Sequence, residues 1–257
     1  MIRRALAAAV AWSLLLVVPA LAQDEAPERG DLYEVITWNV PPAESEAWRT
    51  NVERLAGAAE TAGVEDSWYM WSGPSSFTLV YPIDNYAALD DPMAFERQFQ
   101  GTPAEEAFEQ TMEAFNEIEV TPLLSEIVER VDSWSYASEG AEDRMTWAHI
   151  DEYWLQPGAM EGFGELAEEF VALLERIDYP YAIDGHRVHF GDVGRLVYVT
   201  FVDDLSSFYG ENQLDRAIEA AGAQEEWGAL LEKFTPLVRR IEHYDVRFEP
   251  DLSHVVE

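Results

Sequence analysis

The chain has 257 residues, of which 48% are hydrophobic, a composition that supports two ordinary domains with sizeable cores. Its 50 acidic and 16 basic side chains give a formal net charge of −34, which repels nucleic acid and anionic membrane surfaces. The absence of cysteine excludes a disulfide framework, a thiol nucleophile and the lipid-attachment site of a bacterial lipoprotein.

Residues 1–22 have the three parts of a secretory signal: a basic start, an apolar run and the small-residue cleavage site Ala20-Leu21-Ala22. An uncleaved membrane anchor is the alternative, but the apolar run is short for a bilayer span. Cleavage would leave an N-terminal tail at 23–30 and 14 basic against 50 acidic side chains, a net charge of −36. We therefore expect an exported, periplasmic or extracellular protein with no stable membrane insertion after signal removal.

The chain contains an internal duplication, whose two copies span residues 31–136 and 145–248. Three short segments of similar sequence recur in the same order in both copies. The matched segments are Tyr33–Trp38 with His149–Trp154, Val80–Asn85 with Val199–Asp204, and Val120–Leu124 with Phe234–Val238. A period near 105 residues indicates duplicated domains and not a short solenoid repeat. Residues 137–144 suit an exposed linker, and residues 249–257 form a C-terminal tail.

Each repeat begins with a β-branched and aromatic strand, expected over 31–40 and 146–155, which ends at a proline. Apolar residues at helical spacing then predict a helix with one buried face. A hairpin follows, expected over 68–83 and 181–202, with a glycine-containing turn in both copies.

A second helical region is interrupted by a glycine in both repeats, at Gly101 and Gly222. The last strand is expected over 125–136 and 239–248. The order strand, helix, strand, strand, helix, strand is the split βαβ arrangement of ferredoxin-like domains. Apolar residues occur at both odd and even positions of the strands, which predicts that both faces of the sheet are buried. Helices cover one face, and the sheet of the tandem copy is the simplest cover for the other.

This element order, repeat length, broken second helix and duplication resemble the dimeric α+β barrel superfamily, which includes antibiotic-biosynthesis monooxygenase, NIPSNAP and EthD families. The resemblance covers both repeats. It implies an α+β fold in which tandem ferredoxin-like βαββαβ repeats pack as an intramolecular dimeric α+β barrel. A monomer with an internal pseudo-dimer is therefore expected in place of an obligate homodimer. In active members the ligand occupies the cavity between sheet and helices, and some members are cofactor-independent oxygenases.

Histidines occur only after the first repeat, and this asymmetry is the main functional signal. His149 on the first strand of the second repeat, with His186 and His189 on its second strand, are the candidate catalytic residues, because histidine titrates near neutral pH. A half-buried packing role is the alternative for each. His186 and His189 have opposite parity and are not expected to meet at one metal ion. Aligning the hairpin turns places Trp68 and Trp71 opposite these two histidines.

Aromatic and amide side chains supply the candidate ligand-binding residues, which are Trp38, Asn39, Trp68, Tyr153 and Tyr198. Core packing is the alternative for the tryptophans. Trp38 and Asn39 resemble in type the residues used by haem-degrading and quinone-forming members. The haem-degrading pattern also needs a histidine on the second helix, which neither repeat has, so haem binding by that route is not expected. No cofactor and no metal site are assigned. Calcium-loop, zincin, serine-hydrolase, Walker A and Rossmann motifs do not occur in the sequence.

The sequence thus predicts a protein that binds a small hydrophobic or aromatic molecule in a cavity between sheet and helices. A cofactor-independent monooxygenase-like enzyme is the second hypothesis, and a structural or interaction protein of the cell envelope is the third. Whichever holds, we expect the chemistry in the second repeat and a mainly structural first repeat.

Overall fold

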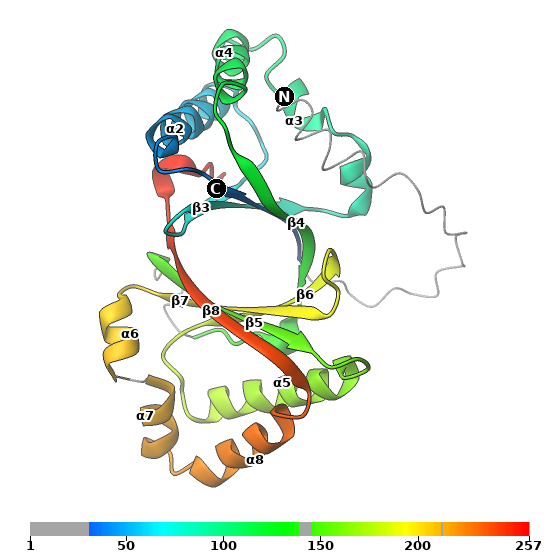
Figure 1. Ribbon diagram of the computed structural model, residues 1–257, viewed down its shortest axis with the longest axis vertical. Helices are drawn as coiled ribbons and strands as arrows, with labels where there is room; N and C mark the ends of the chain where they lie inside the picture. Colours follow the sequence, from blue (N-terminus) through cyan, green and yellow to red (C-terminus); the bar gives the residue numbers. More distant parts are fainter. Residues whose placement is uncertain (1–30, 139–144, 212, 257) are drawn as a thin grey trace, which may run out of the picture. The chain divides into compact units, whose positions relative to one another are not determined.

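The computed structural model describes residues 31–138, 145–211 and 213–256. The predicted signal at 1–22, the tail at 23–30 and linker residues 139–144 lie outside the described residues. The described chain divides into two compact units (Figure 1). Unit 1 contains residues 31–125 together with 249–256, and unit 2 contains residues 126–248. No helix in the described part of the chain is both long enough and apolar enough to cross a membrane.

Unit 1 has an antiparallel sheet with strand order β1-β3-β2, made by β1 (Leu32–Asn39), β2 (Tyr69–Ser72) and β3 (Ser76–Ile83). Its helices are α2 (Ser45–Ala62), the 3-10 helix η1 (Tyr86–Asp90), α3 (Ala94–Arg97) and α4 (Glu105–Phe115). The predicted stripe of α2 buries Trp48, Val52 and Ala59, and the helix ends at Gly63, whose φ of 69° suits glycine. The core thus lies between α2, α4 and one sheet face.

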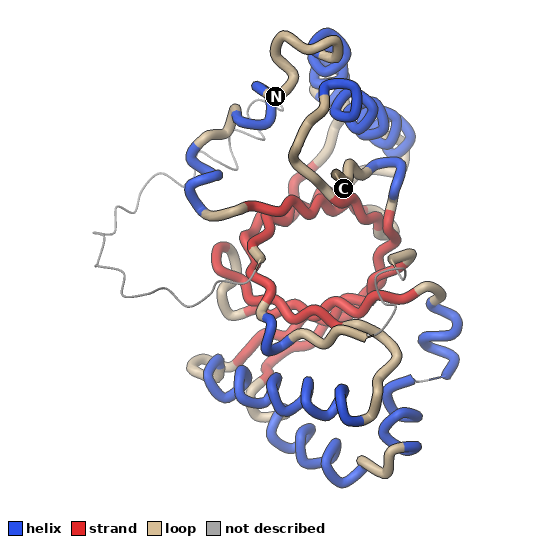
Figure 2. Tube along the Cα trace, turned by 180° about the vertical axis from the view of Figure 1, so that it is seen from behind, coloured by secondary structure: helices blue, strands red, loops and turns tan. Residues whose placement is uncertain are grey.

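Unit 2 has an antiparallel sheet with strand order β8-β5-β7-β6-β4. The strands are β4 (Thr121–Arg130, within the unit from Glu126 onward), β5 (Trp147–Leu155), β6 (Ile183–Phe190), β7 (Arg195–Val202) and β8 (Val238–Phe248). The helices are η2 (Asp132–Trp134), α5 (Met160–Arg176), α6 (Leu205–Glu211), α7 (Gln213–Ala220) and α8 (Gln224–Phe234). Figure 2 shows α5 and α8 on one face of this sheet. A core of aliphatic and aromatic side chains lies between the sheet and the helices.

The glycine breaks predicted in the second helical region are present in both units. Gly101 and Gly222 have φ values of 73° and 67°, and α4 and α8 begin shortly after them. Positive φ strains any residue with a Cβ atom, so glycine allows the chain to turn between two helices here.

The compact units do not coincide with the sequence repeats, because the segment after each final strand packs in the other repeat's unit. Tyr136 forms a two-way backbone bridge with Ile183 in unit 2 (2.7 and 2.9 Å). His254 forms the same bridge with Trp68 in unit 1 (3.0 and 2.7 Å). The 3-10 helices η2 and η4 (Pro250–Leu252) occupy equivalent places in these segments. Each unit therefore contains residues from both repeats.

The last strand of the first repeat differs from its predicted bounds. It runs over Thr121–Arg130, and residues 132–134 form η2 in place of continued strand. The amide of Trp134 donates to Val131 O (2.9 Å), and its indole packs against Gly164 of α5. Burial of Trp134, which is 7% exposed, accounts for the early end of the strand.

The register between the repeats also differs by one residue from the sequence pairing. The amides of Val40 and Leu155 make equivalent bonds at the ends of their strands, to Ser75 O (3.1 Å) and Gly194 O (2.9 Å). Counting back from these residues pairs Trp38 with Tyr153, not with Trp154. A shift of one residue moves a strand side chain to the opposite face of the sheet.

The packing of these aromatic residues confirms the corrected register. Trp38 contacts Trp48 of α2 with ring centroids 5.3 Å apart, and Tyr153 contacts Phe163 of α5 at 6.2 Å. Trp154 lies on the other face of β5, where its indole N–H donates to Asp192 Oδ2 (2.8 Å).

The corrected register also changes which residues are compared between the repeats. Asn39 is equivalent to Trp154 and not to Leu155, and Glu34 is the counterpart of His149. The equivalent bridges of Trp68 and Ile183 place Trp71, not Trp68, opposite His186.

Candidate functional site

The helix-facing surface of the unit 2 sheet carries a group of polar side chains beside its aromatic core. Because side chains alternate along a strand, His149 and Asp151 of β5 share the face of Tyr153, which packs on α5. The antiparallel register places Asp245 of β8 opposite His149, and Tyr198 of β7 opposite Asp151.

His149 lies at the centre of this group and is 9% exposed. Its Nδ1 is 2.9 Å from Asp245 Oδ1 and 3.1 Å from the hydroxyl of Tyr209 on α6, and its Nε2 is 3.5 Å from Asp151 Oδ2. The Tyr209 hydroxyl donates to Asp245, with both carboxylate oxygens about equally distant, at 2.9 and 3.0 Å. We call His149, Asp151, Tyr209 and Asp245 the His149 cluster.

The carboxylates of the cluster favour the charged form of His149. Burial alone would lower the pKa of His149, but hydrogen bonds to Asp151 and Asp245 outweigh it and raise the pKa above the ordinary 6.5. Desolvation and the bond to Asp245 raise the pKa of Tyr209 to about 12, so its hydroxyl stays protonated at neutral pH. The cluster therefore combines a histidine whose charged form is favoured and a protonated phenol with two carboxyl groups that accept their hydrogen bonds.

The pKa shift makes stability depend on pH in a stated direction. When the pKa of a group is higher in the folded state than in the unfolded state, protonation of that group stabilises the fold. This contribution is complete at pH values below the unfolded-state pKa, which is 6.5 for histidine, and is lost as pH rises through the folded-state pKa. The wild-type protein should thus lose stability relative to a His149→Gln variant as pH rises through this range. Urea unfolding of both proteins from about pH 5.5 to 9 tests this, and parallel pH profiles would contradict it.

Two tyrosines extend the site toward the core, of which Tyr198 is buried and Tyr153 is partly buried. The rings of Tyr153 and Tyr198 are 5.7 Å apart, and both contact Phe163. Tyr198 is 6% exposed, and its hydroxyl has no hydrogen-bond partner among the residues that the structure describes. Such a group costs about 1–3 kcal/mol. A water molecule or the polar group of a ligand would remove that cost.

Removing the Tyr198 hydroxyl should not destabilise the ligand-free protein. We expect Tyr198→Phe to leave the melting temperature unchanged or to raise it, because the variant no longer buries an unsatisfied hydroxyl. Tyr136→Phe is the matched control, since the Tyr136 hydroxyl donates to Tyr179 O (2.9 Å) in the same core. The control should lose about 1–3 kcal/mol. Calorimetry compares the two variants, and an equal loss in both would refute the assignment.

The other two candidate catalytic histidines lie apart from the cluster. His189 Nε2 is 2.5 Å from Glu129 Oε2, which also accepts a 2.5 Å bond from Arg187. His186 projects from the face of β6 opposite to that of His189, and burial lowers the pKa of His186. The structure does not gather the three histidines at one point, and their catalytic role stays a prediction.

The candidate ligand-binding residues of the first repeat belong to unit 1. Trp38 packs on α2, and Asn39 ends β1 on the other face, opposite Ser76. Trp68 is 3% exposed, and its indole N–H donates to Leu252 O (3.0 Å). Trp38 and Trp68 thus have packing roles in unit 1, and a ligand-binding role for these residues stays a prediction.

Sequence reasoning missed Tyr209, Asp151 and Asp245, which complete the His149 cluster. Asp245 follows His243 by two residues on the last strand, so the two share a face, and the pairing of β5 with β8 places that face beside His149. The pairing of the first and last strands of the repeat was the signal from which the position of Asp245 could have been predicted. Nothing in the sequence marks Tyr209, which reaches the cluster from α6.

The side chains of the cluster are arranged as hydrogen-bond partners of one another. Asp151 and Asp245 bond to different ring nitrogens of His149, so the three groups do not converge on one point. Within the described ranges, no group of three or more histidine, aspartate or glutamate side chains is arranged to hold a metal ion. All five histidines lie on strands or in the C-terminal segment, and none lies on a helix.

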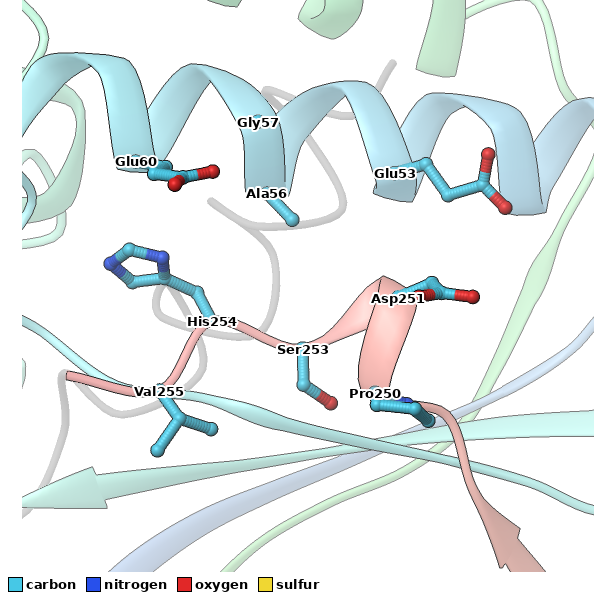
Figure 3. Close-up of a pocket in the computed structure, with 9 residues that line it drawn as sticks. All are labelled: Glu53, Ala56, Gly57, Glu60, Pro250, Asp251, Ser253, His254 and Val255. Atoms are coloured by element: carbon cyan, nitrogen blue, oxygen red, sulfur yellow. The ribbon is translucent and has the colours of Figure 1, made fainter. Parts of the chain in front are cut away.

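Two clefts lie in unit 1. The first, of about 370 Å³, lies between α2 and residues 250–255. Figure 3 shows the carboxylates of Glu53, Glu60 and Asp251 along it, with His254 at one end. The second, of about 320 Å³, lies between the start of α2 and the β2–β3 turn, and Arg49 lines it. Neither contains a predicted site residue.

No family model matches the sequence, and no curated protein is similar to it. Solved structures match its fold. A provisionally named monooxygenase from Fusobacterium nucleatum has a TM-score of 0.56 and 10% identity, covering 86% of this chain and 93% of its own. An anthrone oxidase-like protein has a TM-score of 0.52 and 12% identity, covering 86% and 92%. A chlorite dismutase variant from Candidatus Nitrospira defluvii has a TM-score of 0.51 and 13% identity, covering 87% and 93%.

This chain has the dimeric α+β barrel fold. The matches extend over both units, so one polypeptide contains both α+β repeats of the dimeric α+β barrel, as the duplication predicted. At 10–13% identity the likeness defines the fold alone, and a dimeric α+β barrel can host unrelated reactions. The function must therefore be argued from the side chains of this chain.

Proposed function

We propose that this protein is an exported binding protein for a small hydroxylated aromatic molecule, held on the helix side of the unit 2 sheet at the His149 cluster. The supporting observation is the cluster itself, in which the imidazole of His149 lies between two carboxylates and a tyrosine hydroxyl. The two carboxylates outnumber the one imidazole, so the cluster favours a ligand that donates a hydrogen bond from a phenolic hydroxyl.

Aromatic rings around the cluster suit a flat ligand. The rings of Phe208 and Tyr209 lie 5.1 and 5.7 Å from the imidazole of His149, and Tyr181 is 5.6 Å from Phe208. Tyr209 is 53% exposed, so solvent reaches the cluster from the side of α6. The unsatisfied hydroxyl of Tyr198 would supply a further hydrogen bond deeper in the layer. Aromatic surface with few directed polar groups is the usual composition of a small-molecule site.

The proposed location follows from the N-terminal sequence. A basic start, an apolar run and Ala20-Leu21-Ala22 support export by a signal peptide, and residues 1–22 lie outside the described residues. The excess of carboxylates supports a soluble monomer that avoids nucleic acid and anionic membranes.

A ligand screen with matched histidine variants tests the binding proposal. Thermal shift and calorimetric titration with phenols, quinols and hydroxylated polycyclic aromatics should give at least one ligand whose affinity falls about tenfold or more in His149→Asn, equivalent to about 1.4 kcal/mol. The control is His189→Asn, which removes a histidine bonded to Glu129 on the same sheet and should bind normally. Equal affinity in wild type and His149→Asn would overturn the proposal.

A second candidate function is cofactor-independent oxidation of the same class of ligand, favoured by the His149 to Asp245 pair. Neutral His149 would take a proton from an activated ring CH₂ group, and the carbanion would react with dioxygen. One oxygen atom would become the product carbonyl and the other would leave in water, so that CH₂ and O₂ give C=O and H₂O. The fold neighbours named as a monooxygenase and as an anthrone oxidase-like protein support this class.

Oxygen uptake distinguishes the two functions. An enzyme should consume dioxygen with an anthrone or hydroquinone substrate, and the rate should rise with pH through the raised pKa of His149, because only the neutral imidazole can accept the proton. His149→Asn should lose this pH-dependent step. Ligand binding without oxygen uptake would leave binding as the function.

A further inference from the structure

The second cleft of unit 1 combines one cation with an apolar floor. Arg49 lies on the first turns of α2, and its guanidinium carbon is 5.8 Å from the centre of the Phe77 ring. Val40 and Phe77, which are 2% and 5% exposed, form the apolar wall. Ser45 and Ser72 also line the cleft, whose volume is about 320 Å³. We call this the Arg49 cleft.

A buried carboxylate fixes the orientation of Arg49. Glu249 accepts a bond from Arg49 Nη2 (2.5 Å) and another from Ser72 Oγ (2.5 Å), and its side chain is 9% exposed. The arginine side chain is 35% exposed, so it remains accessible beside this bond. A guanidinium has five N–H donors in a planar fork, and one bond to Glu249 leaves donors for a second carboxylate.

Unit 2 has no equivalent cation at this place. Val40 and Leu155 are equivalent strand ends of the two repeats. Counting forward along the chain from each of them places Gly164 at the position equivalent to Arg49. Gly164 packs against the indole of Trp134, and the nearest ring atom would lie 3.4 Å from an added Cβ. The η4 segment of unit 1 has the smaller Leu252 where η2 has Trp134. Arg49 is thus a feature of unit 1 alone.

We propose that the Arg49 cleft binds the carboxylate group of a small aromatic or aliphatic acid. The carboxylate pairs with the N–H groups of Arg49 that do not bond to Glu249 and with the hydroxyl of Ser45, and the apolar body lies against Val40 and Phe77. A guanidinium pairs with carboxylates through parallel bonds, which gives selectivity over neutral amides of the same shape. This site is separate from the His149 cluster and adds a ligand-binding role to the repeat expected to be structural.

Titration of the full mature chain with benzoate and phenylacetate, each paired with its neutral amide, tests the proposal. The acids should bind at least tenfold more tightly than the amides, and Arg49→Gln should abolish the difference. Arg97→Gln removes an exposed arginine of the same unit, paired with Asp91, and should leave binding unchanged. Equal binding of acid and amide, or equal binding of benzoate by wild type and Arg49→Gln, would overturn the proposal.

A measurement on the wild-type protein covers the case in which Arg49→Gln does not fold. In ¹H–¹⁵N spectra, benzoate should shift the Arg49 side-chain signal and the amide signals of Ser72, Gly73 and Ser75, with inorganic sulfate as a competitor probe. Shifts confined to these positions that sulfate reproduces only at much higher concentration support recognition of the acid and its apolar body. Shifts elsewhere, or equal affinity for sulfate, overturn it.

Discussion

Deleting residues 249–257 should unfold unit 1 and leave unit 2 folded. The segment supplies Leu252, which is 0% exposed, the backbone bridge of His254 with Trp68, and the partner of Arg49. Burial of one leucine contributes about 2–5 kcal/mol, and each lost hydrogen bond adds about 1 kcal/mol. That total approaches the whole stability of an ordinary domain, about 5–15 kcal/mol.

Hydrogen exchange with mass spectrometry measures this by segment. Amides of α2 and β1 to β3 should lose protection in the deletion variant, and amides of β5 to β8 should keep it. Removal of residues 255–257 alone is the control, because Val255 and Val256 are 52% and 45% exposed. In Trp134→Ala the amides of β5 to β8 should lose protection and those of α2 and β1 to β3 should keep it, since Trp134 packs in unit 2. Full protection of unit 1 in the longer deletion would refute the exchange of segments between repeats.

Replacing Arg195 by methionine should destabilise unit 2 by about 3–5 kcal/mol, the usual effect of removing one partner of a buried ion pair. Arg195 bonds to Glu126 and, at 2.5 Å, to Glu152, on the sheet face opposite the His149 cluster. The three side chains are 2–8% exposed. Without the guanidinium, two carboxylates remain buried and uncompensated, and burial already raises the pKa of Glu126.

Denaturant unfolding quantifies this loss against two further variants. Arg176→Met removes an exposed ion pair with Glu226, 46% and 49% exposed, and should cost about 0–1 kcal/mol. Adding Glu126→Gln and Glu152→Gln to Arg195→Met should restore part of the stability, because no buried charge is then left unpaired. Equal losses for Arg195→Met and Arg176→Met would contradict the assigned role.

Local sequence signals predicted most of the secondary structure. Periodic apolar residues located α2 and α5, and glycines at 101 and 222 located the breaks between helices. The segment exchange could not be predicted this way, because Trp134 and Leu252 pack on elements far away in the sequence. The pairing of Trp38 with Trp154 failed for a related reason: matching residue types does not determine which face of a strand a side chain occupies.

The candidate site was predicted only in part. His149 is at the centre of the cluster, as an unusual titratable residue on a strand suggested. Its partners come from β8 and α6, whose positions depend on tertiary packing. Tyr153 and Tyr198 lie beside the cluster in the core, whereas Trp38, Asn39 and Trp68 belong to unit 1. The expectation that all chemistry belongs to the second repeat stays a prediction, and the proposed Arg49 cleft departs from it.

An NMR titration of the His149 imidazole tests the central claim most directly. We predict a pKa above 6.5 in the wild-type protein, a fall in Asp245→Asn, and a change when a hydroxylated aromatic ligand binds. The hydrogen bonds to Asp245 and Asp151 are the physical reason. A pKa at or below 6.5 that neither the variant nor the ligand changes would contradict the assignment of the His149 cluster as the functional centre.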